Sequence, residues 1–321
     1  MIKKVKKVKK RLTNRKKAIS LVQQENQFFV VQKIALYFYT AKRIALRRKG
    51  NLSLCDSLQE ENPAEQDSIL ENKKGKEMFY QVKNNELQEC ALQEAFSFLR
   101  ASGHVVSIVG AGGKSTIMEH LADAAAKLGW KTLVMTSTHM RMPGEHLYAA
   151  DAATVKKFWQ EGRPAVIGTP AADGKMTQPS DELRKAVWPL ADLILIEADG
   201  ARMMPCKVPA AYEPVILPET DTVLGVLGLD ALDKPLQDVC FRLQETEALL
   251  EKSREENLTV EDACKILLSP QGTVKQTTGC HYQIILNKAD GQEAIAKGME
   301  LEKKLRAHGM KDVYLSCFQE G

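Results

Sequence analysis

A glycine-rich run is the part of this 321-residue sequence whose residue types are best suited to chemistry. It lies between an apolar run over 105–109 and an amphipathic run over 117–128, and it reads Gly110-Ala111-Gly112-Gly113-Lys114-Ser115-Thr116. Phosphate binding needs main-chain N–H groups with no Cβ in the way, a helix N-terminus, a lysine and a hydroxyl for Mg²⁺. The sequence therefore predicts that this loop binds phosphates, that Lys114 neutralises β- and γ-phosphate charge and that Ser115 binds Mg²⁺.

The loop departs from the full GxxxxGK[ST] pattern, because Ile108 stands where that pattern has its first glycine. Two other interpretations compete with a phosphate loop. A dinucleotide fingerprint needs a glycine at Ser115 and a carboxylate after the second strand, which instead ends in Thr136-Ser137-Thr138-His139. A plain glycine turn would not need Gly-Lys-Ser at the start of a helix. We favour a phosphate loop that is shorter than usual.

A pair of acids follows an apolar run at 193–196, in the order Glu197-Ala198-Asp199-Gly200. A carboxylate at the tip of a buried strand commonly holds Mg²⁺ or orients an attacking water. Side chains alternate along an extended chain, so Glu197 and Asp199 would face the same side. We predict that Lys114, Glu197 and Asp199 are catalytic and that Ser115, Glu197 and Asp199 bind the metal, without dividing the roles of the two acids. The alternative is a solvated strand end followed by an Asp-Gly turn.

A third motif, Asn287-Lys288-Ala289-Asp290, follows the apolar run at 282–286. GTP-binding proteins read guanine with an NKxD sequence after a strand, and Ser316-Cys317 would supply the loop over the base. We therefore predict that Asn287, Lys288 and Asp290 bind the base, with GTP favoured over ATP. The alternative is that Asp290 merely caps the following helix.

The elements that must position these motifs alternate along the chain. Apolar runs typical of buried strands lie at 105–109, 132–135, 165–167, 193–196, 223–227, 284–286 and 313–315. Helical spacing predicts a lead-in helix over 86–99 and further helices over 117–128, 259–268 and 291–308. This alternation predicts an α/β fold, a P-loop NTPase-like, mostly parallel sheet with helices on both faces, whose sites lie at the carboxyl ends of its strands.

Charge divides the chain into a basic head and an acidic body. Residues 1–50 contain sixteen Lys or Arg and one acid, Glu25, whereas the chain as a whole holds 45 bases and 41 acids. We predict a basic head and polar linker over 1–77 and a nucleotide-binding domain over 78–321, with Met78 a candidate for the true start. Lys33 interrupts the apolar stretch of the head, so no membrane span is indicated. The head could touch anionic lipid or nucleic acid, but we favour a plain appendage with no specific nucleic-acid site.

Seven scattered cysteines include no CxxC pair, which favours a reducing cytoplasm over a disulfide framework or a thiolate zinc site. Cys206 and Cys280 could be reactive thiols, although a free cysteine is more often a small buried hydrophobic residue.

The motifs together resemble the YqeC family, accessory proteins of selenium-dependent molybdenum hydroxylases. The resemblance covers residues 86–321 and rests on VGAGGKST, TSTHM, IEADGAR, PCKVPAAYEPVI, GVLGLDALDKPL and NKAD. It implies a P-loop-like fold and a role in maturing a hydroxylase that contains selenium and molybdenum, but no substrate or reaction. Of the family's motif positions, this chain has Gly110, Gly112, Gly113, Lys114, Ser115, Glu197, Asp199, Arg202 and Asn287 to Asp290.

Three functional hypotheses follow. The first is a Mg²⁺-dependent nucleoside triphosphatase, using GTP or ATP, that works with a selenium-dependent molybdenum hydroxylase or its cofactor-insertion machinery. The second is a module that holds a nucleotide or molybdopterin phosphate without hydrolysis and gates a partner. The third is a phosphoryl or nucleotidyl transferase acting on a selenium or molybdenum precursor.

Overall fold

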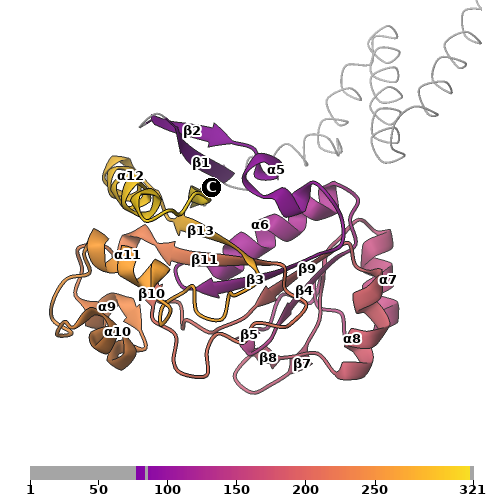
Figure 1. The fold of residues 1–321 in the computed structure, drawn as a ribbon. Coiled ribbons are helices and arrows are strands. Elements are labelled where there is room, and N and C mark those ends of the chain that lie inside the picture. Colours follow the sequence, from indigo (N-terminus) through magenta and orange to yellow (C-terminus); the bar gives the residue numbers. More distant parts are fainter. Residues whose placement is uncertain (1–76, 84–85, 319–321) are drawn as a thin grey trace, which may run out of the picture. The chain divides into compact units, whose positions relative to one another are not determined.

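Seven apolar runs form the parallel part of a nine-stranded sheet in the computed structural model, which describes residues 77–83 and 86–318 (Figure 1). The strand order is β2-β1-β14-β13-β11-β3-β9-β4-β6. The parallel strands are β3 (His104–Gly110), β4 (Thr132–Thr136), β6 (Ala165–Val166), β9 (Leu193–Glu197), β11 (Thr222–Gly228), β13 (His281–Asn287) and β14 (Val313–Phe318). Nearly every residue of these strands except β13's first two is buried, as expected for strands covered on both faces. The predicted α/β class and the strand positions are confirmed.

Helices cover both faces of this sheet, as the buried clusters show. On β9, Leu195 packs with α6 (Lys114–Lys127), whereas Ile194 and Ile196 face the cluster that contains α7 (Ala152–Gln160) and α8 (Asp181–Val187). On β13, Ile284 and Leu286 pack with α11 (Val260–Leu268) and α12 (Gln292–Ala307). The short helices α9 (Leu236–Val239) and α10 (Leu243–Leu250) lie in the same part of the fold, as Figure 1 shows. The predicted helices over 117–128, 259–268 and 291–308 are therefore confirmed.

The predicted lead-in helix over 86–99 is wrong. Glu86–Cys90 forms β2, which pairs antiparallel with β1 (Glu77–Lys83), and β1 in turn pairs antiparallel with β14. Only α5 (Leu92–Ala95) and a 3-10 turn (Ser97–Leu99) are helical. Phe96 and Phe98 are both fully buried, which a continuous helix would not allow because residues two apart point to different sides. Tertiary packing of these aromatics, and not the helical spacing of the aliphatic residues, decides the local structure.

Two small sheets complete the fold. One contains β5 (His139–Arg141), β7 (Thr169–Pro170) and β8 (Lys175–Thr177), and the other pairs β10 (Cys206–Lys207) in parallel with β12 (Cys240–Phe241). Among the described residues, no helix is long and apolar enough to cross a membrane. The predicted basic head and most of the linker, residues 1–76, lie outside the described residues.

Candidate functional site

The glycine loop joins the carboxyl end of β3 to the start of α6, in the middle of the sheet. Gly110, Gly112 and Gly113 all have positive φ angles, of 89°, 88° and 118°. A Cβ on Gly112 would lie 2.2 Å from the backbone nitrogen of Gly228, and one on Gly113 would lie 2.2 Å from the Asn287 amide nitrogen. The backbone conformation and the close contacts both require glycine at these positions.

Three main-chain amides of the loop already donate to protein acceptors. Gly110 N–H donates to Asp199 Oδ2 at 3.2 Å, Ala111 N–H to the carbonyl of Val226 at 2.9 Å, and Gly112 N–H to the carbonyl of Met204 at 3.1 Å. The amides at the start of α6 have no acceptor within the helix, because a helix leaves its first N–H groups unpaired. In this conformation, therefore, the main-chain amides still free to donate belong to the first turn of α6, where Ser115 and Thr116 are exposed.

Lys114 points to the acid on the neighbouring strand. Its ammonium lies 3.0 Å from Asp199 Oδ1 and donates to the carbonyl of Gly110 at 2.6 Å. The other carboxylate oxygen of Asp199 lies 3.1 Å from the ammonium of Lys207. Lys114, Asp199 and Lys207 are at most 5% exposed, so one buried carboxylate contacts two buried lysines.

This charged network continues away from the loop. Lys207 also pairs with Glu213 at 2.9 Å and donates to the carbonyl of Gly200 at 2.6 Å. Glu213 in turn accepts from Arg242, at 3.1 Å between Oε1 and Nη2. Burial alone would raise the pKa of the Glu213 carboxyl, but hydrogen bonds from Arg242 and Lys207 hold that pKa below its ordinary value. The network therefore links the loop lysine to Arg242, whose guanidinium stacks 4.7 Å from the ring centroid of Phe241.

Glu197 occupies a different position from Asp199. Its Oε2 accepts from the Ser115 hydroxyl at 3.3 Å, and its carboxyl is 7% exposed. Burial raises the pKa of Glu197; the Lys114 charge opposes that shift and the Asp199 charge adds to it. Close by, the Ser137 amide donates to the Glu197 carbonyl, while the Thr138 hydroxyl oxygen is buried without a hydrogen-bond partner. The Ser115 hydroxyl and the Glu197 carboxylate, which contact each other, are hard oxygen donors of the kind that Mg²⁺ prefers.

Protein groups alone do not form a complete metal cage. Within 77–83 and 86–318, no three His, Cys, Asp or Glu side chains are grouped so that they could hold an ion. Mg²⁺ is usually bound through one or two carboxylates together with substrate phosphates and water. Two surface depressions lie away from the loop, one beside Leu128 and one beside Cys280.

The NKxD motif reaches the loop through its first residue. The Asn287 side chain donates to the carbonyl of Gly112 at 2.7 Å and accepts from the Ser316 hydroxyl at 2.8 Å. Lys288 pairs instead with Asp230 at 2.7 Å, beyond the carboxyl end of β11. The structure thus brings Asn287 to the loop and turns Lys288 toward Asp230.

Asp290 is exposed, and its Oδ1 accepts from the Cys317 thiol at 2.8 Å. Burial and this bond to Asp290 raise the pKa of Cys317 to about 12. The N-cap of α12 is Gly291, with no side-chain hydrogen bond, so the helix-capping interpretation of Asp290 is wrong. Ser316 and Cys317 are buried residues inside β14, so the predicted loop over the base at these two positions is wrong.

Sequence reasoning missed the inner part of the network. Lys207, Glu213, Arg242 and Asp230 were not predicted as site residues. The available signal was a lysine between residues as apolar as Cys206 and Val208, since a buried lysine needs a carboxylate partner. Arg202, a family motif position, is exposed, with its guanidinium 5.4 Å from the ring centroid of Phe241.

Comparison with known proteins gives two matches. The family model described as YqeC protein matches residues 106–244, which contain the loop, both acids of the strand end and the network from Lys207 to Arg242. A protein of Escherichia coli (strain K12), described as "Uncharacterized protein YqeC", is 29% identical over 234 residues, which cover 67% of this chain and 88% of the relative. The motifs and both matches agree, so this chain is similar to YqeC proteins over a region that contains the loop and its charged network.

Proposed function

We propose that this protein binds a nucleoside triphosphate with Mg²⁺ at the loop Gly110–Thr116. One observation carries the proposal: the side chains that such a ligand needs meet at the carboxyl ends of β3 and β9, where Lys114 contacts Asp199 and Ser115 contacts Glu197. Parallel α/β sheets bind ligands at this edge. The first turn of α6 adds unpaired amides and the positive end of its dipole.

The two acids take different roles in this proposal. Asp199 is already held by Lys114, Lys207 and the Gly110 amide, so it serves as the counter-ion that keeps the loop lysine in place. Ser115 and Glu197 would hold Mg²⁺, which supplies positive charge against the triphosphate. Lys114 would exchange its contacts within the protein for phosphate oxygens. This exchange is possible because Lys207 remains to neutralise Asp199.

The base end favours GTP. Asp290 is exposed and accepts a hydrogen bond from the Cys317 thiol. Asn287, the first residue of the NKxD motif, donates a hydrogen bond to the glycine loop. A carboxylate at Asp290 can accept from the ring N–H and exocyclic amine of guanine, whereas adenine offers no such pair of donors. Lys288 and Asn287 then act as braces.

A second candidate is binding without hydrolysis. Because Asp199 is neutralised by two lysines, Glu197 is the one carboxylate of the pair left for metal or water. A site with a single available carboxylate can hold Mg²⁺ and nucleotide yet lack a group to orient water. On the family resemblance we propose that either activity serves the maturation of a selenium-dependent molybdenum hydroxylase in the cytoplasm.

Calorimetric titration of the purified protein with GTP and ATP, each with and without Mg²⁺, tests the proposal. We expect Mg²⁺-dependent binding that Lys114→Ala weakens at least about tenfold, the loss of one charge-assisted contact. Lys127→Ala, at the exposed last turn of the same helix, is the matched control and should bind as the wild type does. Circular dichroism confirms that each variant is folded.

The proposal fails if the wild type binds neither nucleotide, or if Lys114→Ala binds as tightly as Lys127→Ala. Phosphate release, measured on the same samples, separates the candidates. Steady release supports a nucleoside triphosphatase, tight binding without release supports the gating module, and a modified precursor without free phosphate supports a transferase.

A further inference from the structure

Two free cysteines stand opposite each other in the small sheet of β10 and β12. Cys206 and Cys240 are direct partners in the parallel register, and they are 1% and 4% exposed. Neighbouring strands lie about 4.8 Å apart, within the roughly 4.4–6.8 Å that a disulfide needs between Cα atoms. Paired residues also project to the same face of a sheet. The register therefore places the two cysteines side by side, at a strand spacing that a disulfide can span.

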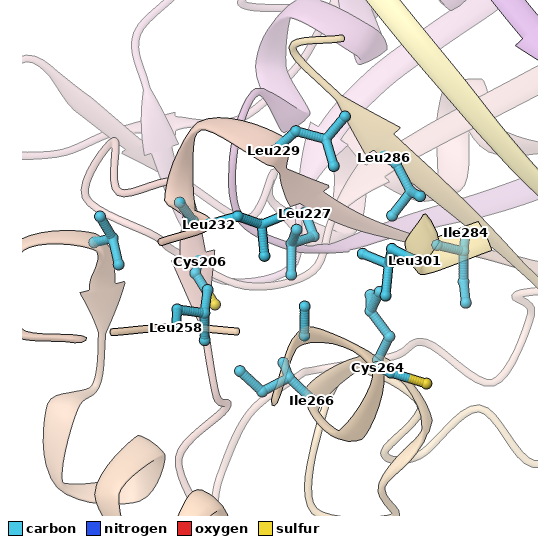
Figure 2. Close-up of a cluster of buried hydrophobic side chains, with 14 of the residues drawn as sticks. Cys206, Leu227, Leu229, Leu232, Leu258, Cys264, Ile266, Ile284, Leu286 and Leu301 are labelled. Atoms are coloured by element: carbon cyan, nitrogen blue, oxygen red, sulfur yellow. The ribbon is translucent and has the colours of Figure 1, made fainter. Parts of the chain in front are cut away.

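The surroundings of Cys206 disfavour its thiolate form. A hydrogen bond with the Cys240 thiol raises the pKa of Cys206 well above its ordinary value, and burial adds to the effect. Figure 2 shows Cys206 in an apolar cluster with Leu227, Leu232 and Leu258 around it. Because the thiolate is the reactive form, oxidation must wait for local opening of the short strands.

The next register pair explains why such a bond would matter. Lys207 follows Cys206 and is opposite Phe241, which follows Cys240. Lys207 is the lysine that pairs with Asp199 and Glu213, and Arg242 stacks on the ring of Phe241. Only two residue pairs hold these strands together. A covalent bond at the first pair would fix the position of Lys207 at the second.

We propose that Cys206 and Cys240 are an oxidisable dithiol whose disulfide fixes the strand pair that positions Lys207. With hydrogen peroxide as oxidant, one Sγ–Sγ bond forms, two S–H bonds and the O–O bond break, the thiols lose two electrons and the peroxide becomes two waters. A thiol reductant reverses the reaction. This inference does not depend on nucleotide binding.

Peptide mapping by mass spectrometry tests it on the full-length, folded protein treated with hydrogen peroxide at mildly alkaline pH. We expect a cross-linked pair of peptides containing Cys206 and Cys240, lighter by two hydrogen atoms than the sum of the reduced peptides. The oxidised protein should melt roughly 5–10 °C higher, the shift typical of one disulfide in a domain of this size. Dithiothreitol should remove both changes.

Three variants make the outcome decisive. Cys206→Ser and Cys240→Ser should each lose the cross-link and the melting shift, whereas Cys264→Ala, a buried cysteine in the same apolar cluster, should keep both. The proposal is overturned if the native protein forms no Cys206–Cys240 link under these conditions, or forms it only when denatured. It is also overturned if the link forms but the melting temperature does not rise.

Discussion

The Asn287 side-chain amide donates to the carbonyl oxygen of Gly112 at 2.7 Å. This single bond joins the end of β13 to the glycine loop, across β11, which lies between β13 and β3 in the sheet. The Ser316 hydroxyl holds the other end of the same amide. The proposed base-reading and phosphate-binding parts of the site therefore share one side chain.

Replacing Asn287 should disturb both parts together. Asn287→Ala leaves the buried Gly112 carbonyl and the Ser316 hydroxyl without their partner, which typically costs about 1–3 kcal/mol of folding stability. Chemical denaturation should show this loss, and nucleotide affinity should fall with it. Ser316→Ala, which removes only the donor to Asn287 Oδ1, should have a smaller effect on affinity. An equal loss in the two variants would contradict the bridging role.

The close approach of Gly112 to Gly228 predicts a severe effect of one methyl group. Gly112→Ala would place its Cβ 2.2 Å from the Gly228 nitrogen in a chain with φ of 88°, so we expect at least about 3 kcal/mol of destabilisation or no folded protein. Gly129→Ala is the matched control, because Gly129 also has a positive φ but its Cβ would meet nothing within 4 Å. That change should cost only the roughly 1–2 kcal/mol of the left-handed conformation. Similar melting temperatures for the two variants would argue against the contact.

Lys207 should be required for the fold. Lys207→Met removes one of the two cations that contact Asp199 and one of the two that contact Glu213. Breaking a buried charge network by removing one partner typically costs about 3–5 kcal/mol. Urea titration measures this loss. Lys234→Met, an exposed lysine between β11 and α9, should change stability by less than about 0.5 kcal/mol. If the two variants unfold at the same urea concentration, the network does not stabilise the protein.

The raised pKa of Glu197 predicts two opposite dependences on pH. The folded state holds the Glu197 proton more tightly than the unfolded state, so this group's contribution to stability falls as pH rises from the ordinary carboxyl pKa through the raised one. Mg²⁺ competes with the same proton, so Mg²⁺-dependent nucleotide affinity should increase over that window. Titrations between about pH 8 and pH 5 should show affinity lost toward the acid end.

Glu197→Gln is the variant that isolates this effect. It keeps the shape of the side chain but cannot ionise, so affinity should be low and should no longer change with pH over the acid range. A wild-type affinity that is flat with pH, or a variant that keeps the acid dependence, would exclude Glu197 as the titrating metal ligand.

Asp290 should determine base preference and little else. Asp290→Ala should lower GTP affinity by about tenfold or more, since hydrogen bonds to a charged group are worth roughly 1.5–3 kcal/mol, and should leave ATP affinity unchanged. Glu293→Ala, in the exposed first turn of α12, controls for the loss of a negative charge nearby. Equal changes in GTP and ATP affinity would show that Asp290 does not read the base.

The sequence predicted the sheet because its strands are short apolar runs that end in polar motifs, and both features are local. The sequence could not assign separate roles to Glu197 and Asp199, because those roles depend on contacts with Lys207. Lys207 lies eight residues after Asp199, and the chain returns it to the strand end through the irregular turn around Met203. It also misread 86–90 as helical, because Leu87 fits both a helical face and an edge strand. Pairing with β1, a distant contact, decides between the two.

β1, which forms an antiparallel ribbon with β2, pairs with the edge of β14, and in this seam Tyr80 is opposite Leu315. β14 carries Ser316 and Cys317, which donate hydrogen bonds to Asn287 and Asp290. The partners in this seam are more than two hundred positions apart in the chain, and contacts over such separations form late in folding. The proposed nucleotide site therefore takes its final form only once β1 has paired with β14.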